Sequence, residues 1–281
     1  MNDLLVSAGV LAGTVTICEV LRRTAKELLH PRRRRGRQSR PDPLPLEVSV
    51  ELFSTLQLCI CTHELRLLGC SGLLSGHCAL GLLLTYLMTL VHVSSFGGAS
   101  CNPVSCLEQF LRGQSSGAAA ASKVLAQFTA ASVARRLSEM VWFLDMSDIH
   151  VRHRQRQYEC ASALNATASS GAVVEFACAF ALRTALFRFA HLEWRHKIHL
   201  VAAVVTFLVF AVGDLTGAMF NPALAYSITF NCEGNTFVEY SFVYWLGPLM
   251  GAMTAVMLFE EKLAPCTLAE SETREANKKR N

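Results

Sequence analysis

The chain has 281 residues, of which 52% are hydrophobic and only 17% are charged, and its mean hydropathy is +0.32. Soluble domains usually carry about 25% charged residues, and the charges here are clustered, so long neutral stretches remain. This composition excludes an ordinary soluble domain and indicates a membrane protein that crosses the bilayer several times.

The first predicted element is the apolar stretch 4–21. A cleaved signal peptide is the weaker interpretation, because a basic start and a clear cleavage site are missing from it. The stretch therefore either spans the membrane or lies at its surface. Six more apolar stretches approach the length of about 20 residues that a helix needs to cross the hydrocarbon core. They are 47–64, 76–93, 118–134, 171–190, 198–213 and 239–259. We therefore predict an all-α membrane protein with six transmembrane helices and an extra N-terminal hydrophobic helix.

Lys and Arg gather in three segments, 22–40, 188–197 and the tail 260–281. Cytosolic loops of membrane proteins are enriched in these residues, and an even number of predicted spans separates the three segments. We therefore place all three in the cytosol and the loop 141–170 on the opposite side. Arg183, towards the cytosolic end of its span, is expected to extend its side chain to the surface.

Motifs of several other protein classes do not occur in the sequence. The run RRRRGR (32–37) is interpreted as a basic block beside the membrane rather than a nuclear-targeting or nucleic-acid patch, so we predict no nucleic-acid partner. The eleven cysteines are scattered, and Cys59-x-Cys61 has no partner histidines, so we predict no metal site and no disulfide framework. His63-Glu64 lacks the second His of a zinc protease motif. No cofactor is expected.

One heptapeptide pattern occurs twice, as GASCNPV at 98–104 and GAMFNPA at 217–223. In each half, the first span carries an acid that is expected to be buried, Glu51 in VELFSTLQL and Glu175 in VEFACAFAL. Each half contains three spans, and because three is odd, the second half must insert upside down relative to the first. We expect both acids to accept hydrogen bonds from unwound backbone beside the motifs. The alternative is a carboxylate that reaches interfacial water.

Asn-Pro is a helix-start signal, because Asn is a preferred N-cap and Pro is preferred at the first helical position. Asn102-Pro103 and Asn221-Pro222 therefore predict two short helices that begin in mid-membrane, which is tolerated where the backbone lines a watery cavity. Their N-termini would meet, each with a partial charge of about +0.5, and the Asn amides would donate into the space between them. Neutral solutes would pass there, whereas protons and cations would not.

These motifs resemble those of the aquaporin family over about 47–259, together with Ala126-Gln127, Asp214-Leu-Thr-Gly and YWLGPLMGA (244–252). Within the family, QLCICTHELRLL (57–68) and the stretch 198–225 are similar to the divergent superaquaporins of the aquaporin-11 group. The resemblance implies a right-handed bundle of six transmembrane helices plus two re-entrant half-helices, assembled as a homotetramer in the lipid bilayer. It also implies a passive channel for water, glycerol and hydrogen peroxide. The predicted domains are 1–46 (N-terminal hydrophobic segment and basic linker), 47–259 (channel, with repeats at about 47–140 and 171–259) and 260–281 (cytosolic tail).

The selectivity filter that the resemblance implies is apolar. Its four positions are Leu82, Val209, Ala218 and Leu224. Leu224 replaces the Arg of orthodox members, and Val209 replaces the His of water-selective ones. Val104 stands where orthodox members have Ala, as Ala223 does in the second motif. Water loses hydrogen bonds in an apolar constriction, and a loss of about 1.4 kcal/mol slows passage about tenfold. We therefore expect slow water flux and a smaller penalty for glycerol and peroxide.

Four residues outside the predicted pore carry further expectations. Cys232 matches a Cys that the resembled group associates with assembly, with an ordinary loop thiol as the alternative. Lys278 and Lys279 form a KKxx arrangement read by retrieval coats of the endoplasmic reticulum, with a merely solvated tail as the alternative. Asn165 begins an N-glycosylation sequon. We predict residence in the endoplasmic reticulum membrane, with other vesicles or the cell membrane as alternatives.

A channel is favoured over two other functional classes. A membrane-embedded enzyme would need paired acids, metal ligands or a nucleophile and base deep in the bundle, and the sequence offers none of these. A non-conducting scaffold is the stronger rival, because an apolar filter and Val104 also suit a closed pore. Flux measurements separate these two classes.

Overall fold

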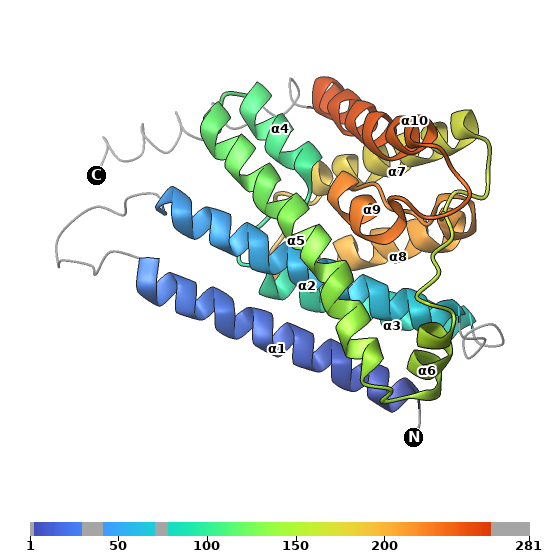
Figure 1. Ribbon diagram of the computed structural model, residues 1–281. Coiled ribbons are helices and arrows are strands. Elements are labelled where there is room, and N and C mark those ends of the chain that lie inside the picture. The colour runs from blue at the N-terminus through green and yellow to red at the C-terminus, as the bar shows by residue number, and fades with distance from the viewer. Residues whose placement is uncertain (1–2, 30–41, 71–77, 260–281) are drawn as a thin grey trace, which may run out of the picture.

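The computed structural model describes residues 3–29, 42–70 and 78–259, and helices make up most of them (Figure 1). In chain order they are α1 (Asp3–Leu29), α2 (Leu44–Cys70), α3 (Cys78–Ser95), α4 (Pro103–Leu111), α5 (Gly117–Phe143), α6 (Asp148–Gln155), α7 (Ala168–Arg188), α8 (Trp194–Thr216), α9 (Pro222–Thr229) and α10 (Phe237–Ser241). The last helix continues from α10 through a π-helical turn, η1 (Phe242–Leu246), to Phe259.

Five of the described helices are long and apolar enough to cross a membrane: α1, α2, α7, α8 and the helix over Phe237–Phe259. The apolar run of α3, Ala79–Ser95, is shorter, and α5 is 27 residues long but carries charges such as Lys123 and Arg135. With α4 and α9 as the two short helices, the predicted bundle of six spans, two half-helices and an extra N-terminal helix is confirmed.

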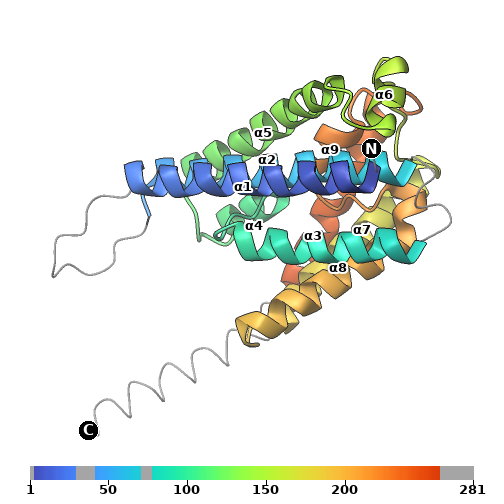
Figure 2. The same cartoon turned by 90° about the horizontal axis from the view of Figure 1, so that it is seen from below.

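The extra helix α1 lies along α2 in both ribbon views (Figures 1 and 2). Polar contacts join the pair near both ends: Ser7 Oγ donates to Glu64 Oε1 at 2.5 Å, and Arg22 Nη2 donates to Gln57 Oε1 at 2.8 Å. At 1.5 Å per residue, a helix of 27 residues is about 40 Å long. α1 is therefore long enough to cross the bilayer beside α2, which the sequence alone did not decide.

Small residues allow the last helix to approach α7 closely. A Cβ on Gly251 would lie 2.1 Å from Phe176 O, and a Cβ on Gly247 would lie 2.8 Å from Ala172 O. Glycines four residues apart let transmembrane helices pack backbone against backbone. Any side chain at Gly251 would force the two helices apart and disturb the second half of the bundle.

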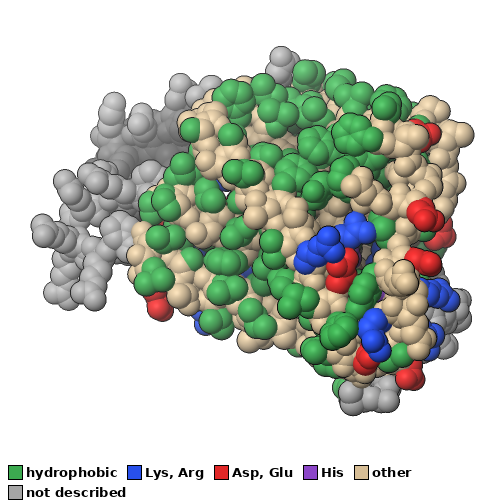
Figure 3. Space-filling view, in the orientation of Figure 1, with side chains coloured by type: hydrophobic (Ala, Val, Ile, Leu, Met, Phe, Trp, Pro, Cys, Tyr) green, Lys and Arg blue, Asp and Glu red, His purple; other side chains and the backbone are tan. Residues whose placement is uncertain are grey.

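The helix ends beside the predicted basic segments share one side of the molecule. Figure 2 shows the C-terminal end of α1 and the N-terminal end of α8 on the side opposite α6. The run 32–37 and the tail from 260 onward lie outside the described residues. Figure 3 shows apolar side chains over much of the visible face. Leu125 and Met257 are among the exposed apolar residues of the protein. This surface suits contact with lipid.

Candidate functional site

The helices α4 and α9 begin at the two Asn-Pro motifs. Asn102 Oδ1 accepts a hydrogen bond from Val104 N at 3.0 Å. Asn221 Oδ1 accepts bonds from Ala223 N at 3.0 Å and from Leu224 N at 3.3 Å. Both Asn residues are N-caps in extended conformation, and Pro103 and Pro222 follow at the first helical position, where no N–H is needed.

The side-chain amides of the two Asn residues join the halves of the protein. Asn102 Nδ2 donates to Phe220 O at 3.2 Å, and Asn221 Nδ2 donates to Cys101 O at 2.7 Å. Each carbonyl belongs to the residue just before the opposite Asn. We call this pair of bonds the Asn–carbonyl contact. It brings the tips of α4 and α9 together, although the motifs are far apart in sequence.

Backbone strain aims those two carbonyls. Cys101 has a φ of 52° and Phe220 a φ of 33°, in the left-handed region that non-glycine residues rarely adopt. We expected the amide groups to donate into the space between the tips. One hydrogen of each amide instead crosses to the opposite half, which leaves the second N–H of each amide for that space.

Glu51 of α2 lies beside the loop that precedes α4. Its Oε1 accepts hydrogen bonds from Ser100 N at 2.8 Å and from the Ser100 hydroxyl at 3.0 Å. Its Oε2 accepts from Cys101 N at 2.9 Å and from Gln127 Nε2 of α5, also at 2.9 Å. Glu51 is buried, so these donors offset the cost of removing its charge from water.

Glu175 of α7 occupies the matching place beside the loop that precedes α9. Its Oε1 accepts hydrogen bonds from the Thr216 hydroxyl at 2.6 Å and from Met219 N at 3.0 Å, and its Oε2 accepts from Phe220 N. Glu175 is 0% exposed. Both predicted acids thus bind the N–H groups of the two residues that precede an Asn.

The far end of α4 is held by an ion-pair cluster that sequence reasoning missed. Glu108, which is 1% exposed, pairs with Arg112 at 2.9 Å and with Arg183 of α7. Arg183 is half-buried, with 22% of its side chain exposed, so the expected extension to the surface is only partial, because a buried carboxylate lies within its reach. Its guanidinium also stacks on the Phe187 ring, 4.5 Å from the centroid.

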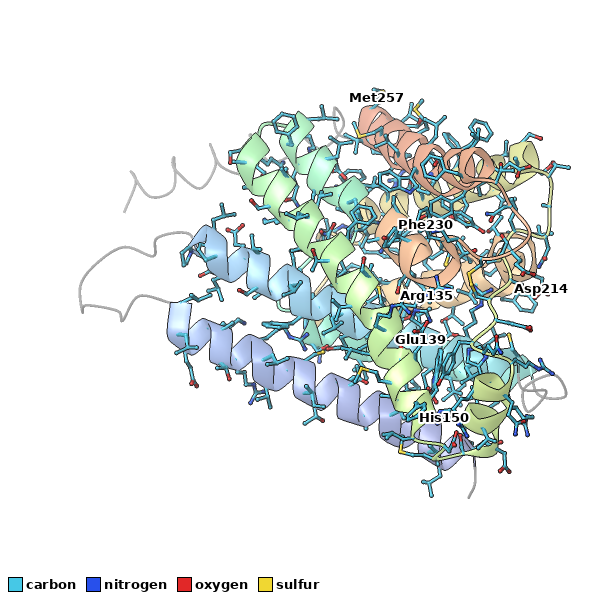
Figure 4. All side chains as sticks on the ribbon, viewed as in Figure 1. Arg135, Glu139, His150, Asp214, Phe230 and Met257 are labelled. Atoms are coloured by element: carbon cyan, nitrogen blue, oxygen red, sulfur yellow. A yellow bond between two sulfur atoms is a disulfide. The ribbon has the colours of Figure 1, made fainter. Side chains whose placement is uncertain are left out.

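The far end of α9 is held by a disulfide between Cys160 and Cys232. The sequence analysis predicted no disulfide framework and missed this bond, because only the fold brings together residues that are 72 positions apart. A usable signal existed, since both cysteines lie in loops on the predicted non-cytosolic side. Arg135 of α5 donates to Phe230 O at 2.9 Å (Figure 4).

The four predicted filter residues lie in different surroundings. Leu224 is half-buried and packs against two apolar clusters, one around Met219 and Tyr244 and one around Cys59 and Ala131. Ala218 is buried in the loop before α9, with a φ of 49°. Val209 lies on α8, one turn before Gly213.

The fourth filter position, Leu82, lies on α3. It lines an open apolar groove between α3 and α8, beside Phe207 and Phe210. Both of these phenylalanines are largely exposed, at 65% and 63%. Leu224, in contrast, packs into the two buried clusters around α9.

A second buried acid of α2 lies near the C-terminal end of that helix. Glu64 accepts hydrogen bonds from Ser7 Oγ, from Trp142 Nε1 at 2.9 Å and from His150 Nε2 at 3.1 Å. His153, on α6 beside the Trp142 ring, has a pKa lowered by burial and by the charge of Arg156. Within residues 3–29, 42–70 and 78–259, no group of three or more His, Cys, Asp or Glu side chains could hold a metal ion.

The remaining predicted residues lie either in a surface loop or outside the described residues. Asn165 is exposed in the loop before α7, and its Nδ2 donates to Asp214 O at 2.9 Å. Thr167 of the same sequon caps α7 through Ser170 N. Lys278 and Lys279 lie outside the described residues.

Comparisons with known proteins agree on one family. Residues 78–259 match the family model of the major intrinsic proteins. The chain is 33% identical to aquaporin-11 of Homo sapiens over 92% of its length and 90% of that protein. It is 35% identical to aquaporin-12 of Mus musculus over 94% of its length and 88% of that protein. The solved structure of the aquaglyceroporin from Plasmodium falciparum shares the fold, with a TM-score of 0.52 and 13% identity over 92% of this chain and 96% of that one.

Proposed function

The chain belongs to the major intrinsic protein family of membrane channels, and from this premise we propose that it conducts glycerol, hydrogen peroxide and, more slowly, water in an intracellular membrane. The observation that carries the proposal is the Asn–carbonyl contact, in which Asn102 and Asn221 tie the N-termini of α4 and α9 together. Two helix N-termini at one point create a local positive potential that disfavours cations. We propose no catalytic role.

Proton exclusion in this proposal rests on the free N–H of each Asn amide. One hydrogen of each Nδ2 is used across the contact, and the other can donate to the oxygen of a passing solute. A water held in this way by two donors directs its own hydrogens away from the contact. A chain of waters is then interrupted at that point, and protons cannot hop along it.

Solute preference in this proposal rests on the apolar residues beside α9. Leu224 follows the second motif and packs among apolar side chains, so it offers no hydrogen bond to a solute. Water therefore loses hydrogen bonds in the passage that no protein group replaces. A larger solute with carbon atoms, or one with a weaker hydration shell, loses less hydration free energy there. Val209 and Ala218 would extend this apolar lining. Leu82 would add to this lining only from α3.

The acids Glu51 and Glu175 are proposed to hold the loops that aim the tips. Without them, the N–H groups of Ser100, Cys101, Met219 and Phe220 would lack a protein acceptor, which costs about 1–3 kcal/mol for each buried group. Cys232 is proposed to support assembly through its bond to Cys160, which fixes the end of α9.

A location and an assembly are also part of the proposal, and the likeness to aquaporin-11 and aquaporin-12 supports them. We propose residence in the endoplasmic reticulum, through recognition of Lys278 and Lys279 by a retrieval coat, and a homotetrameric assembly. The Cys160–Cys232 disulfide supports an oxidising environment on that side of the membrane. A sugar on Asn165 would require its amide to leave Asp214 O.

Stopped-flow light scattering from proteoliposomes tests the proposal. Vesicles that contain the wild-type chain should shrink and refill faster in glycerol than protein-free vesicles, with a smaller gain for water. Leu224→Arg should reduce glycerol flux relative to water flux, because a fixed cation narrows and polarises the passage. Leu215→Arg, an exposed position on α8, is the matched control. Glycerol flux equal to that of protein-free vesicles would instead identify a non-conducting scaffold.

A further inference from the structure

A cavity of about 680 Å³ lies between α1, α3 and α8, away from the tips of α4 and α9. We call it the α1–α3–α8 pocket. It opens where α1 and α3 approach their C-terminal ends and α8 begins, on the side that the positive-inside pattern places in the cytosol. At this level of a membrane protein the surrounding medium is lipid headgroup rather than hydrocarbon.

Cations of α1 dominate the wall of this pocket. Arg22, Arg23 and Lys26 face a single carboxylate, Glu19, so the wall carries a positive excess. Glu19 pairs with Arg22 at 3.1 Å and with Arg23 at 2.7 Å. Among the ion pairs of the described residues, none includes Lys26. Its ammonium lies over Gly97, where a Cβ would be 3.5 Å from Nζ.

One of these cations is fixed before any ligand arrives. Arg22 is only 2% exposed, and its guanidinium donates to Gln57 Oε1 at 2.8 Å and to Ser54 Oγ at 3.4 Å. A guanidinium held in place loses little side-chain entropy when it attracts an anion. Arg23 and Lys26 are exposed and can turn towards a bound phosphate. The pocket thus combines a rigid cation with two adaptable ones.

A separate apolar groove lies further along the same seam between α3 and α8. Leu82 and Leu83 of α3 and Phe207 and Phe210 of α8 line it, and we call it the α3–α8 groove. Tyr86, in the groove, bonds through its hydroxyl to His199 Nδ1, in the pocket, at 2.7 Å.

The dimensions of the seam suit a lipid. From Ser94 in the pocket to Leu82 in the groove, α3 rises about 18 Å at 1.5 Å per residue. This length compares with the ~15 Å depth of one leaflet of hydrocarbon. A molecule with one charged end and one apolar chain would therefore fill both features at once.

We propose that the pocket and the groove together bind one anionic phospholipid of the cytosolic leaflet. The headgroup phosphate would lie on Arg23 and Lys26, with Arg22 behind them, and one acyl chain would lie in the groove. Basic pockets between transmembrane helices on the cytosolic side suit anionic headgroups. A soluble phosphate would use the pocket but would leave the apolar groove unoccupied. The pocket lies on α1, α3 and α8 and the groove on α3 and α8, so neither is lined by the half-helices α4 and α9.

Native mass spectrometry of the full-length protein in neutral detergent tests the headgroup contacts. Phosphatidylserine and phosphatidylcholine serve as probes. The wild-type chain should retain phosphatidylserine preferentially, and Arg23→Gln with Lys26→Gln should weaken that retention at least tenfold. The control is Arg188→Gln with Arg195→Gln, which removes two exposed cations near the same side but outside the pocket. Equal loss in both double variants, or no loss in either, would overturn the proposal.

A second pair of variants tests the groove and separates a lipid from a soluble phosphate. Ala203 is exposed and lines the groove, so Ala203→Trp should fill it and weaken phosphatidylserine retention several-fold. Val173→Trp, at a 67% exposed position on α7, should have no effect. Binding of glycerol phosphate as tight as that of the lipid, or unchanged lipid retention in Ala203→Trp, would overturn the proposal. Complete loss of lipid upon self-association would do so as well, since a second copy would then occupy the seam.

Discussion

The loop before α4 and the loop before α9 both contain unwound backbone N–H groups that need an acceptor inside the protein. The two loops share the kind of acceptor but differ in the other donors around it. In both, a buried carboxylate accepts the N–H groups of the two residues that precede the Asn. Each carboxylate also accepts one hydroxyl, from Ser100 in the first loop and from Thr216 in the second. Glu51 alone accepts a fourth donor, the amide of Gln127 from a neighbouring helix. The two backbone N–H groups are the fixed requirement, because unwound backbone in a membrane must be satisfied within the protein.

The far ends of the two half-helices show a second difference. The end of α4 is held by the ion pairs of Glu108 with Arg112 and Arg183, and the end of α9 by the Cys160–Cys232 disulfide. A disulfide persists only on the oxidising side of a membrane. The two anchors therefore differ as expected if α4 ends near the cytosol and α9 near the lumen.

The largest effect is expected when one acid is removed and the two loops are compared. Glu175→Ala leaves the Thr216 hydroxyl, Met219 N and Phe220 N without their acceptor, and we expect a loss of about 3–6 kcal/mol of stability. Glu51→Ala should cost less, because Gln127 Oε1 is buried without a partner and can accept in its place after the amide turns. Thermal unfolding in detergent measures both losses.

The double variant Glu51→Ala/Gln127→Ala sharpens this comparison. It removes the substitute acceptor, so its stability should fall to that of Glu175→Ala. Gln114→Ala, outside both loops, is the control for loss of a Gln side chain. If Glu51→Ala and Glu175→Ala lower stability equally, Gln127 does not act as a substitute acceptor in the first loop.

The next largest effect concerns the anchor of α9. Cys160→Ser with Cys232→Ser should lower stability by about 2–4 kcal/mol, because the unfolded chain is no longer cross-linked. Reductant should destabilise the wild-type protein by a similar amount and leave the double variant unchanged. Cys70→Ser, at an exposed free cysteine, should behave as wild type in both conditions. A wild-type melting temperature that stays the same with and without reductant would contradict this role.

The anchor of α4 should contribute less, because it has two cations. Arg183→Gln leaves Arg112 to pair with Glu108, so we expect a loss of about 2 kcal/mol rather than the 3–5 kcal/mol of an uncompensated buried charge. Arg188→Gln, at an exposed cation five residues later, should change stability by less than about 0.5 kcal/mol. Urea titrations of both variants give the difference. Equal stability of the two would rule out the Glu108 cluster as an anchor.

The smallest effect is expected at the tips themselves. Val104→Ala gives the first motif the small residue that Ala223 supplies in the second, at a cost of about 1–1.5 kcal/mol for lost apolar contacts. Ala223 is 0% exposed, so the reverse change Ala223→Val should cost more through overpacking. Stability measurements on the two variants show which of the two half-helix tips is packed more tightly. A larger loss from Val104→Ala would show that the first tip is the tighter one.

The sequence was sufficient for features that repeat. Six spans, two Asn-Pro helix starts and two matched acids follow from periodic apolar runs and from a motif that occurs twice. The Asn–carbonyl contact was only partly predictable. The sequence predicted the two Asn-Pro helix starts, but Cys and Phe are not residue types that indicate the left-handed φ found at Cys101 and Phe220. It takes a folded chain to show which carbonyl each amide reaches.

Long-range pairs of single residues were not predictable from the sequence. Glu108 and Arg183 are 75 positions apart, and Cys160 and Cys232 are 72 apart. Neither pair repeats in the other half, so no internal comparison points to it. Arg22 was predicted only as part of the cytosolic basic segment 22–40, yet it is buried, because Gln57 of the neighbouring helix accepts a hydrogen bond from it.

One measurement tests the central claim, that the Asn–carbonyl contact lines a passage for neutral solutes and not for protons. Proteoliposomes that hold a peroxide-sensitive and a pH-sensitive dye report both fluxes at once. Wild-type vesicles should take up peroxide faster than protein-free vesicles while their proton leak stays at the protein-free rate. Asn221→Asp replaces the donor that reaches Cys101 O with a charged acceptor, so it should slow peroxide and raise the proton leak, whereas Asn231→Asp in the exposed loop should do neither. Peroxide uptake at the protein-free rate, or an Asn221→Asp variant that matches wild type in both fluxes, would contradict the account.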